Sequence, residues 1–120
     1  MKKIILLIGV LLIIGCQPQT QNQQIEGFVP DRTIEIDAFS FGYEPDSIRL
    51  TEGEKIRLIV TNNENIRHTF TVPKLNIDVN LRANSVEEID FIAPMTGDIE
   101  FFCTVFGHRP AGMEGNIHIE

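Results

Sequence analysis

The sequence predicts an all-β fold, an antiparallel sandwich or barrel of about seven or eight short strands. From about Arg32 onward, apolar residues alternate with polar ones at a period of two, which is typical of half-buried strands and not of helices. Residues that favour turns separate these alternating segments. We therefore expect one folded domain over residues 32–120.

Five segments show the alternation most clearly. Their apolar residues are, in chain order, Ile34 and Ile36; Ile48 and Leu50; Ile56, Leu58 and Val60; Ile89 and Phe91; and Ile117 and Ile119. The turn signals lie at Glu44-Pro45-Asp46, Glu52-Gly53-Glu54, Asn62-Asn63, Pro94 and Thr96-Gly97-Asp98. Residues 77–82 fit no strand in this scheme, and we expect a short helix or a loop there.

Strand parity also sorts the side chains that carry chemistry, because successive strand residues point to opposite faces. His68 and Cys103 each share a face with the apolar residues of their own strand. Those apolar residues are Phe70 and Val72 for His68, and Ile99 and Phe101 for Cys103. His118 alternates with two isoleucines and is expected to point to solvent. Parity thus separates two candidate ligands from a bystander.

The first 15 residues are typical of an export signal. Met1-Lys2-Lys3 is basic and residues 4–14 are apolar apart from Gly9, a run about half the ~20 residues that a membrane-spanning helix needs. Gly15-Cys16 resembles a bacterial lipobox, in which the cysteine becomes the lipid-modified N-terminus; an ordinary signal peptide with an incidental cysteine is the alternative. We predict a signal peptide over residues 1–15, and a lipidated Cys16 with a disordered glutamine-rich tether over residues 16–31. The protein would then be exported and lipid-anchored at the outer face of the cell membrane.

Charge and cysteine usage narrow the class of protein. The formal net charge is −7 at pH 7, and cleavage before Cys16 would remove two lysines and leave about −9. Nucleic-acid binding needs clustered positive charge, so we predict no nucleic-acid partner and expect basic protein partners. With Cys16 lipidated, Cys103 is the only thiol of the domain. A lone exported thiol is prone to oxidation, and metal ligation is a common reason to keep one.

The segment from Cys103 to Met113 carries three metal-binding side chains. Cys103, His108 and Met113 are each separated by four residues in a glycine-rich loop, and a second imidazole, His68, comes from a distant strand. Each residue alone has an ordinary interpretation: a core histidine, a buried thiol, a loop histidine or a packed methionine. Together, two imidazoles, a thiolate and a weak axial thioether form the ligand set of a blue-copper centre. Zinc is the second metal considered, although structural zinc prefers more cysteines.

The loop sequence CTVFGHRPAGMEGNIHI resembles the C-terminal copper loop of the cupredoxins. Phe41-Gly-Tyr-Glu-Pro45 and the segment from Asn62 to His68-Thr-Phe also fit the order of that family, so the resemblance runs from about Thr33 to Glu120. It implies a Greek-key β-sandwich, one type 1 copper ion and one-electron transfer. It also implies the ligands His68, Cys103, His108 and Met113, and a redox partner that is a cytochrome or an oxidase-like protein.

The chain departs from the family at three points. Gly107 stands where binuclear copper domains have a second cysteine, which disfavours a dicopper site. Thr69 stands where many carriers have an asparagine, so bracing of the copper loop would depend on its hydroxyl. Only His118 remains as a further histidine, and a catalytic copper needs more. We therefore expect no enzymatic activity and no small-molecule substrate.

Two roles remain open at this stage. The first is a membrane-anchored, extracytoplasmic one-electron carrier with one copper ion, and the alternative is copper delivery, storage or oxidase assembly. For a carrier, electrons would leave through His108, within an apolar patch of Val105, Phe106, Pro110 and Ala111. Arg67 and Arg109 would form a positive rim around it, or would be ordinary solvated arginines.

Overall fold

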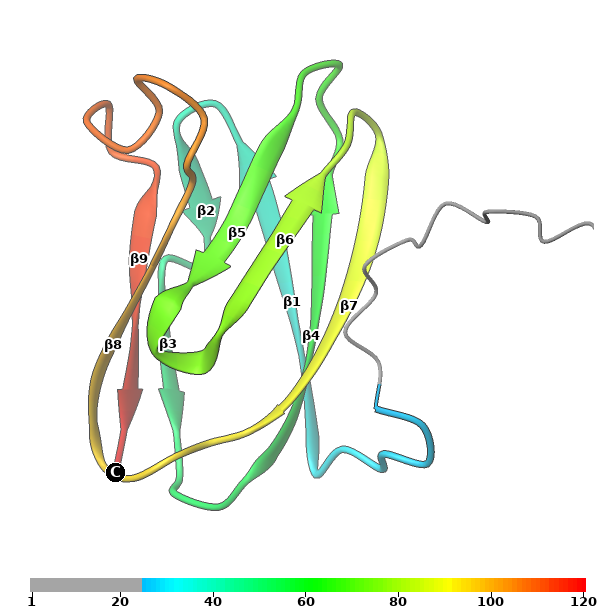
Figure 1. Cartoon of the computed structure of the whole chain (residues 1–120), viewed down its shortest axis with the longest axis vertical. Helices are drawn as coiled ribbons and strands as arrows, with labels where there is room; N and C mark the ends of the chain where they lie inside the picture. The colour runs from blue at the N-terminus through cyan, green and yellow to red at the C-terminus, as the bar shows by residue number, and fades with distance from the viewer. Residues whose placement is uncertain (1–24) are drawn as a thin grey trace, which may run out of the picture.

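Two β-sheets packed face to face make up the domain in a computed structural model that describes residues 25–120 (Figure 1). One sheet has the strand order β2 (Gly42–Glu44), β1 (Arg32–Phe39), β4 (Lys55–Asn62), β7 (Ser85–Ile92). The other has the order β3 (Ser47–Leu50), β9 (Glu114–Ile119), β8 (Gly97–Phe102), β5 (His68–Val72), β6 (Ile77–Leu81). The predicted signal peptide, Cys16 and the tether up to residue 24 lie outside the described residues.

The predicted all-β sandwich is confirmed, with nine strands in the described part of the chain. Two of the strand pairs are parallel, β1 with β4 and β3 with β9, whereas the sequence predicted antiparallel pairing. Alternation reports which face of a strand is buried, but it carries no information on the direction of the neighbouring strand. The fold class was therefore predictable and these two directions were not.

Residues 77–82 form neither the helix nor the loop that we expected. Ile77–Leu81 is strand β6 at the edge of its sheet, paired antiparallel with β5. Its buried residues alternate with the exposed Asp78 and Asn80, so the period-two pattern is present but short. A 3-10 turn over Pro73–Leu75 joins the two strands, and Asn76 ends it in the left-handed conformation. This hairpin places Leu81 opposite His68.

The core contains side chains from both sheets, and its largest members are completely or almost completely buried. They include Ile36, Ile56, Leu58 and Ile89 from the first sheet, and Phe70, Leu81, Phe101 and Ile117 from the second. Burying one such side chain fully is worth about 1.5–3 kcal/mol, so this core supplies a large stabilising term without any metal. We expect the domain to fold in the metal-free state.

An aromatic cluster fills the core below the loop from Cys103 to Met113. The rings of Tyr43 and Phe101 meet edge to face with centroids 5.2 Å apart, and the ring centroids of Phe70 and Phe101 are 5.0 Å apart. A side chain at Gly115 would collide with the ring of Phe101 and with the carbonyl of Asp46, so only glycine fits there. The tight packing fixes where the loop re-enters β9.

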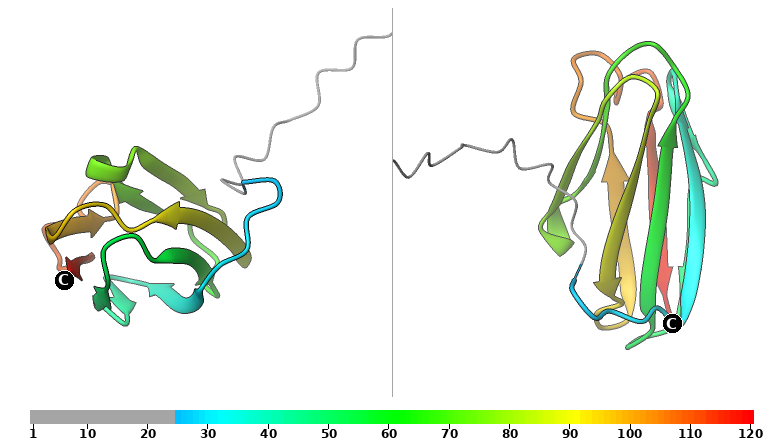
Figure 2. Two further views of the ribbon diagram at one scale, coloured as in Figure 1. Left: turned by 90° about the horizontal axis from the view of Figure 1, so that it is seen from below. Right: turned by 90° about the vertical axis from the view of Figure 1, so that its right-hand side faces the viewer.

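Several connections lie at one end of the sandwich, opposite the C-terminus (Figures 1 and 2). They join β1 to β2, β4 to β5, β6 to β7, and β8 to β9. His68 begins β5 and Cys103 follows β8, so strands from one sheet deliver both residues to this end. Among residues 25–120, no helix has the length and apolar character needed to cross a membrane.

Candidate metal centre

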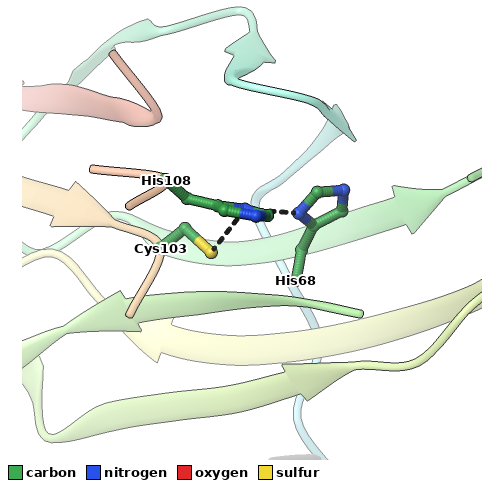
Figure 3. A group of neighbouring side chains, drawn as sticks. All are labelled: His68, Cys103 and His108. Atoms are coloured by element: carbon green, nitrogen blue, oxygen red, sulfur yellow. Dashed lines mark hydrogen bonds between the residues drawn. The ribbon is translucent and has the colours of Figure 1, made fainter. Parts of the chain in front are cut away.

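His68 enters the site from the first position of β5. Its side chain is fully buried on the core face of the strand, as parity predicted. Its Nδ1 atom lies 3.2 Å from Nδ1 of His108 (Figure 3). Pairing with Leu81 on β6 holds the backbone at this position, so the imidazole projects from a fixed strand and not from a loop.

Cys103 follows the last residue of β8 and its side chain is almost completely buried. Its Sγ atom lies 3.7 Å from Nδ1 of His108 and accepts a hydrogen bond from the backbone N–H of Thr69 at 3.4 Å. It is the free thiol of the described residues. The thiolate is the form of cysteine that binds metal, and its sulfur can accept this hydrogen bond.

The loop between β8 and β9 curls back on itself and presents His108. His108 N–H donates to the carbonyl of Val105, and its own carbonyl accepts from Ala111 and Met113. Its ring is partly exposed and meets the edge of Phe41, with centroids 5.2 Å apart. The second imidazole is thus held by a hydrogen-bonded turn at the surface.

Met113 is the fourth predicted ligand, and its side chain is completely buried where the loop ends. Its backbone N–H donates to the carbonyl of His108 at 3.0 Å, and its carbonyl accepts from the N–H of Cys103 at 3.1 Å. These two bonds tie Met113 to both loop ligands. Axial ligation by its thioether remains a prediction.

The ligand atoms of His68, Cys103 and His108 all lie within 4.8 Å of one another. No other group of three or more histidine, cysteine or acidic residues in the described part of the chain brings its ligand atoms so close. Two imidazole nitrogens and one thiolate sulfur suit copper. The same donor types also bind zinc. The donor set therefore fits a single soft or borderline metal ion.

Thr69 braces the loop from the neighbouring strand. Its Oγ1 accepts a hydrogen bond from the backbone N–H of Thr104 at 2.8 Å and lies 3.0 Å from the Thr104 hydroxyl. The departure from asparagine at this position therefore keeps a side-chain link across the site. With the bond from its backbone N–H to the sulfur of Cys103, Thr69 makes three contacts to the start of the loop.

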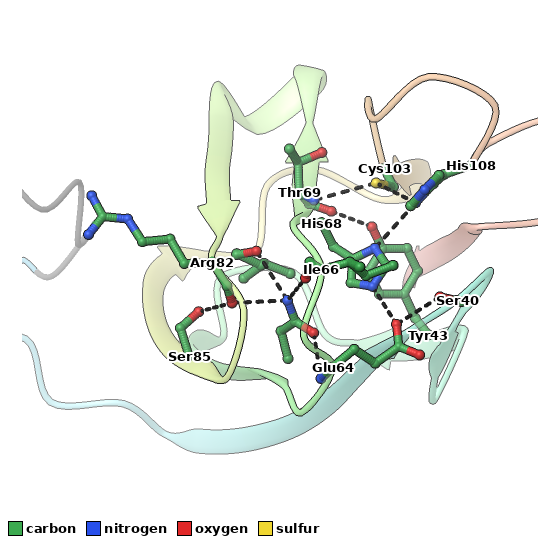
Figure 4. Close-up of polar contacts among 12 residues, drawn as sticks. Ser40, Tyr43, Glu64, Ile66, His68, Thr69, Arg82, Ser85, Cys103 and His108 are labelled. Carbon is green, nitrogen blue, oxygen red and sulfur yellow. Dashed lines mark hydrogen bonds and ion pairs between the residues drawn. The ribbon is translucent and has the colours of Figure 1, made fainter.

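Glu64 is a part of the site that sequence reasoning missed. Its Oε2 atom lies 2.7 Å from Nε2 of His68 and accepts a hydrogen bond from the Ser40 hydroxyl at 2.9 Å (Figure 4). The bond to His68, helped by the one from Ser40, lowers the pKa of the Glu64 carboxyl below its usual range. The available signal was a carboxylate four residues before a candidate ligand, because metal-binding histidines commonly donate their second N–H to such a group.

The residues around the site differ in part from the predicted rim. Phe106 is fully exposed, and Pro110 and Ala111 of the same loop are exposed too, whereas Val105 is partly buried and packs against the core. Arg109, however, pairs with Glu114 at 2.9 Å and with Glu100 at 3.2 Å. Two carboxylates offset its charge, so Arg109 adds little to a positive rim.

His118 lies away from the site, as predicted. Its ring is partly exposed on β9, and Nδ1 lies 2.7 Å from a carboxylate oxygen of Asp98. It therefore forms a surface pair on the outer face of its sheet.

Curated relatives match parts of the chain. Over 79 residues it is 27% identical to the nitrous-oxide reductase of Cupriavidus necator, and over 80 residues it is 29% identical to cytochrome c oxidase subunit 2 of Thermus thermophilus. These matches cover 63% and 64% of this chain, but only 12% and 58% of the two relatives. The chain thus corresponds to one segment of larger proteins.

Solved structures share the fold. Auracyanin A, a "blue" copper protein from Chloroflexus aurantiacus, superposes with a TM-score of 0.64 at 18% identity. The superposition covers 74% of this chain and 98% of auracyanin A. The family described as "Cupredoxin-like domain" matches residues 3–117, nearly the whole sequence. The predicted resemblance is confirmed, and the chain belongs to the cupredoxin-like domain family.

Proposed function

We propose that this protein is a one-electron carrier that binds a single type 1 copper ion. His68, Cys103 and His108 would bind the ion, and Met113 would supply a weaker thioether donor. The observation that carries the proposal is the convergence of one ring nitrogen from each histidine and one Sγ atom within 4.8 Å, at the end of a cupredoxin-like sandwich. The two Nδ1 atoms face each other, and Sγ lies 3.7 Å from Nδ1 of His108. Copper, when bound, would supply the change of oxidation state.

The protein's own contribution is a rigid set of donors. His68 and Cys103 sit at buried strand ends, and Thr69 holds the loop through two hydrogen bonds. Ligands that move little between oxidation states keep the cost of electron transfer low, and the surrounding apolar core tunes the potential. The buried position of the thiol also protects it from oxidation.

Electron exchange would occur at the partly exposed edge of His108. The exposed Phe41 meets the His108 ring, and Phe106 and Pro110 are exposed apolar residues of the same loop as His108. An apolar patch that can be desolvated suits brief docking to a redox protein, for which we propose a cytochrome or an oxidase-like partner. Because Arg109 is paired with Glu100 and Glu114, Arg67 is the arginine left to contribute local positive charge.

The cellular setting of the proposal rests on the N-terminal sequence. Residues 1–15 would be the export signal, Cys16 the lipidation site and residues 16–31 the tether for a domain over residues 32–120. Lipid chains would then hold the protein at the outer face of the membrane, with the electron-exchange surface free to meet partners. A Cys16→Ala variant should leave the membrane fraction or fail to be processed, as seen by cell fractionation and immunoblotting.

Copper delivery, storage or oxidase assembly is the alternative role. Delivery requires ligands that a partner can reach, and both the His68 imidazole and the Cys103 thiol are buried. This burial favours a resident ion over an exchangeable one, and with it a carrier over a delivery protein. We propose no catalytic reaction for this domain.

The test is copper titration of the unaltered protein and of Cys103→Ser, followed by visible absorption. The unaltered protein should develop an intense thiolate-to-Cu(II) band that saturates at one copper per chain. Cys103→Ser should stay folded by circular dichroism and lack the band. An intense band in the variant would refute the thiolate assignment, and tight binding of zinc with no coloured copper form would point to a structural metal instead.

A further inference from the structure

We propose that Glu64 is a positioning residue of the metal centre, which fixes the tautomer of His68 and whose negative charge favours the oxidised metal. This inference rests on the proposed copper site, although its first half concerns the protein alone. It begins from the 2.7 Å contact between Oε2 of Glu64 and Nε2 of His68.

The contact with Glu64 decides which ring nitrogen of His68 carries the proton. An ionised carboxylate can only accept hydrogen bonds, so Nε2 of His68 carries the proton. The lone pair of the neutral imidazole then lies on Nδ1, which is the atom that faces His108 and Cys103. The 3.2 Å contact between the two Nδ1 atoms is accordingly donated by His108. Glu64 thus directs the binding electron pair of His68 into the site.

Glu64 is itself held in place through its carboxylate and through its backbone. Ser40, in the connection between β1 and β2, donates its hydroxyl to the same Oε2 atom. Behind Glu64, the completely buried Asn62 accepts the Glu64 N–H through its side-chain oxygen at 3.0 Å. The Asn62 amide group also contacts the carbonyls of Ile66 and Arg82, at 2.8 and 2.9 Å. The β4–β5 connection is therefore shaped so that Glu64 reaches back to the histidine.

The charge of Glu64 gives the contact a second effect. The His68 side chain is fully buried and that of Glu64 is about one third exposed, so the carboxylate acts on the site partly shielded from water. A negative charge one imidazole away stabilises a more highly charged metal ion more strongly than a less charged one. Loss of that charge should weaken Cu(II) binding relative to Cu(I) and raise the reduction potential.

Glu52 offers a matched control for the charge. Glu64 follows the last residue of β4 by two positions, whereas Glu52 precedes its first residue by three, at the other end of the strand. Glu52 is exposed, and Glu52→Gln removes the same single charge from the protein. Exposed charges separated by more than about 10 Å are largely screened at 0.1 M salt. A change confined to Glu64→Gln therefore reports the local contact and not the net charge.

The first readout needs no metal. In the metal-free protein at about pH 8, where an ordinary histidine is neutral, long-range proton–nitrogen NMR spectra report which ring nitrogen carries the proton. We expect His68 in the Nε2–H form in the unaltered chain. Glu64→Asp, which keeps the charge but is one methylene shorter, should lose this preference. An Nδ1–H form of His68 in the unaltered chain would overturn the proposal.

The second readout is the reduction potential of the copper-loaded variants. Glu64→Gln should lower the affinity for Cu(II) relative to Cu(I) about tenfold, which corresponds to a rise in potential of about 59 mV. Glu52→Gln should leave the potential unchanged. Equal shifts of the potential in the two variants, or no shift in either, would contradict a local effect of the Glu64 charge on the metal. Circular dichroism of each metal-free variant establishes that it is folded.

Failure of the proposed function looks different from failure of this inference. An unaltered protein without a thiolate–copper band would reject the copper carrier, while the His68 tautomer in the metal-free chain would still decide whether Glu64 positions the imidazole. A coloured unaltered protein with an unshifted Glu64→Gln potential would keep the carrier and reject the role of Glu64.

Discussion

The two imidazoles of the centre are held in opposite ways. His68 is fully buried at the start of a strand, and its outer nitrogen is bonded to a carboxylate that neighbouring loops hold in place. His108 sits in a surface loop, partly exposed, against the edge of Phe41. One imidazole therefore fixes the geometry of the site, and the other connects it to the surface. The strand side should govern stability and potential, and the loop side should govern contact with partners.

The largest effect on stability is expected on the strand side, from Asn62→Ala. The side-chain amide of Asn62 donates hydrogen bonds to the carbonyls of Ile66, Leu81 and Arg82. Alanine would leave these carbonyls without their donor, and each buried polar group left unsatisfied costs about 1–3 kcal/mol. The urea midpoint of the metal-free protein should fall by a corresponding amount. The neighbouring Asn63 is exposed, so Asn63→Ala should leave the midpoint almost unchanged. Equal losses in both variants would mean that the β4–β5 connection is not organised by Asn62.

A smaller effect on the loop is expected from Thr69→Val. This change keeps the shape of the side chain but removes the acceptor for the Thr104 N–H, at a cost of about 1 kcal/mol. The loop should become more mobile, which faster amide exchange at Thr104 would reveal. Thr51→Val alters an exposed threonine at the far end of the domain and serves as the control. Unchanged exchange at Thr104 would show that the backbone alone holds the loop.

Met113→Leu tests whether the thioether of Met113 is a weak ligand of the metal. Leucine fills a similar volume, so the fold should persist, and the intense visible band should remain because the two imidazoles and the thiolate are kept. The reduction potential should rise, since a weak donor is lost. Voltammetry and absorption of the same sample measure both properties. Complete loss of copper binding would make Met113 a principal ligand and the site a different kind of centre.

The change expected to disturb the metal centre least is Phe106→Ser, at the surface. Phe106 is fully exposed, so neither the copper spectrum nor the stability should change, whereas electron exchange with a soluble cytochrome c should slow. Val86→Ser removes an exposed apolar residue from β7 in the other sheet and should leave the rate unchanged. Equal rates in all three proteins would place the contact surface elsewhere.

The strand side of the centre was largely predictable from sequence. Period-two alternation put His68 and Cys103 on core faces because strand side chains alternate strictly, and it turned His118 outward. The same rule missed β6, because only five residues alternate there, and it gave no information on the parallel pairing of β1 with β4. Local patterns thus report burial well and pairing direction poorly.

The contacts made in the connections were harder to predict. Glu64 meets His68 in the connection between β4 and β5, where Asn62 accepts a hydrogen bond from the Glu64 N–H. Of the two roles left open for Arg109, the positive rim is disfavoured, because β8 supplies Glu100 and β9 supplies Glu114 as its partners. For Glu64 the sequence offered only its spacing of four residues from His68, and the course of the connection decides whether such a spacing becomes a contact. For Arg109, the pairing with Glu100 depends on where β8 lies beside the loop.

The most direct test of the proposed centre is X-ray absorption at the copper edge, on protein loaded with one equivalent of copper. The fine structure counts the donor atoms around the ion and separates sulfur from nitrogen and oxygen. We expect one short sulfur and two imidazole nitrogens, from Cys103, His68 and His108. A shell of nitrogen and oxygen without a short sulfur, or a second copper at close range, would contradict a mononuclear type 1 site.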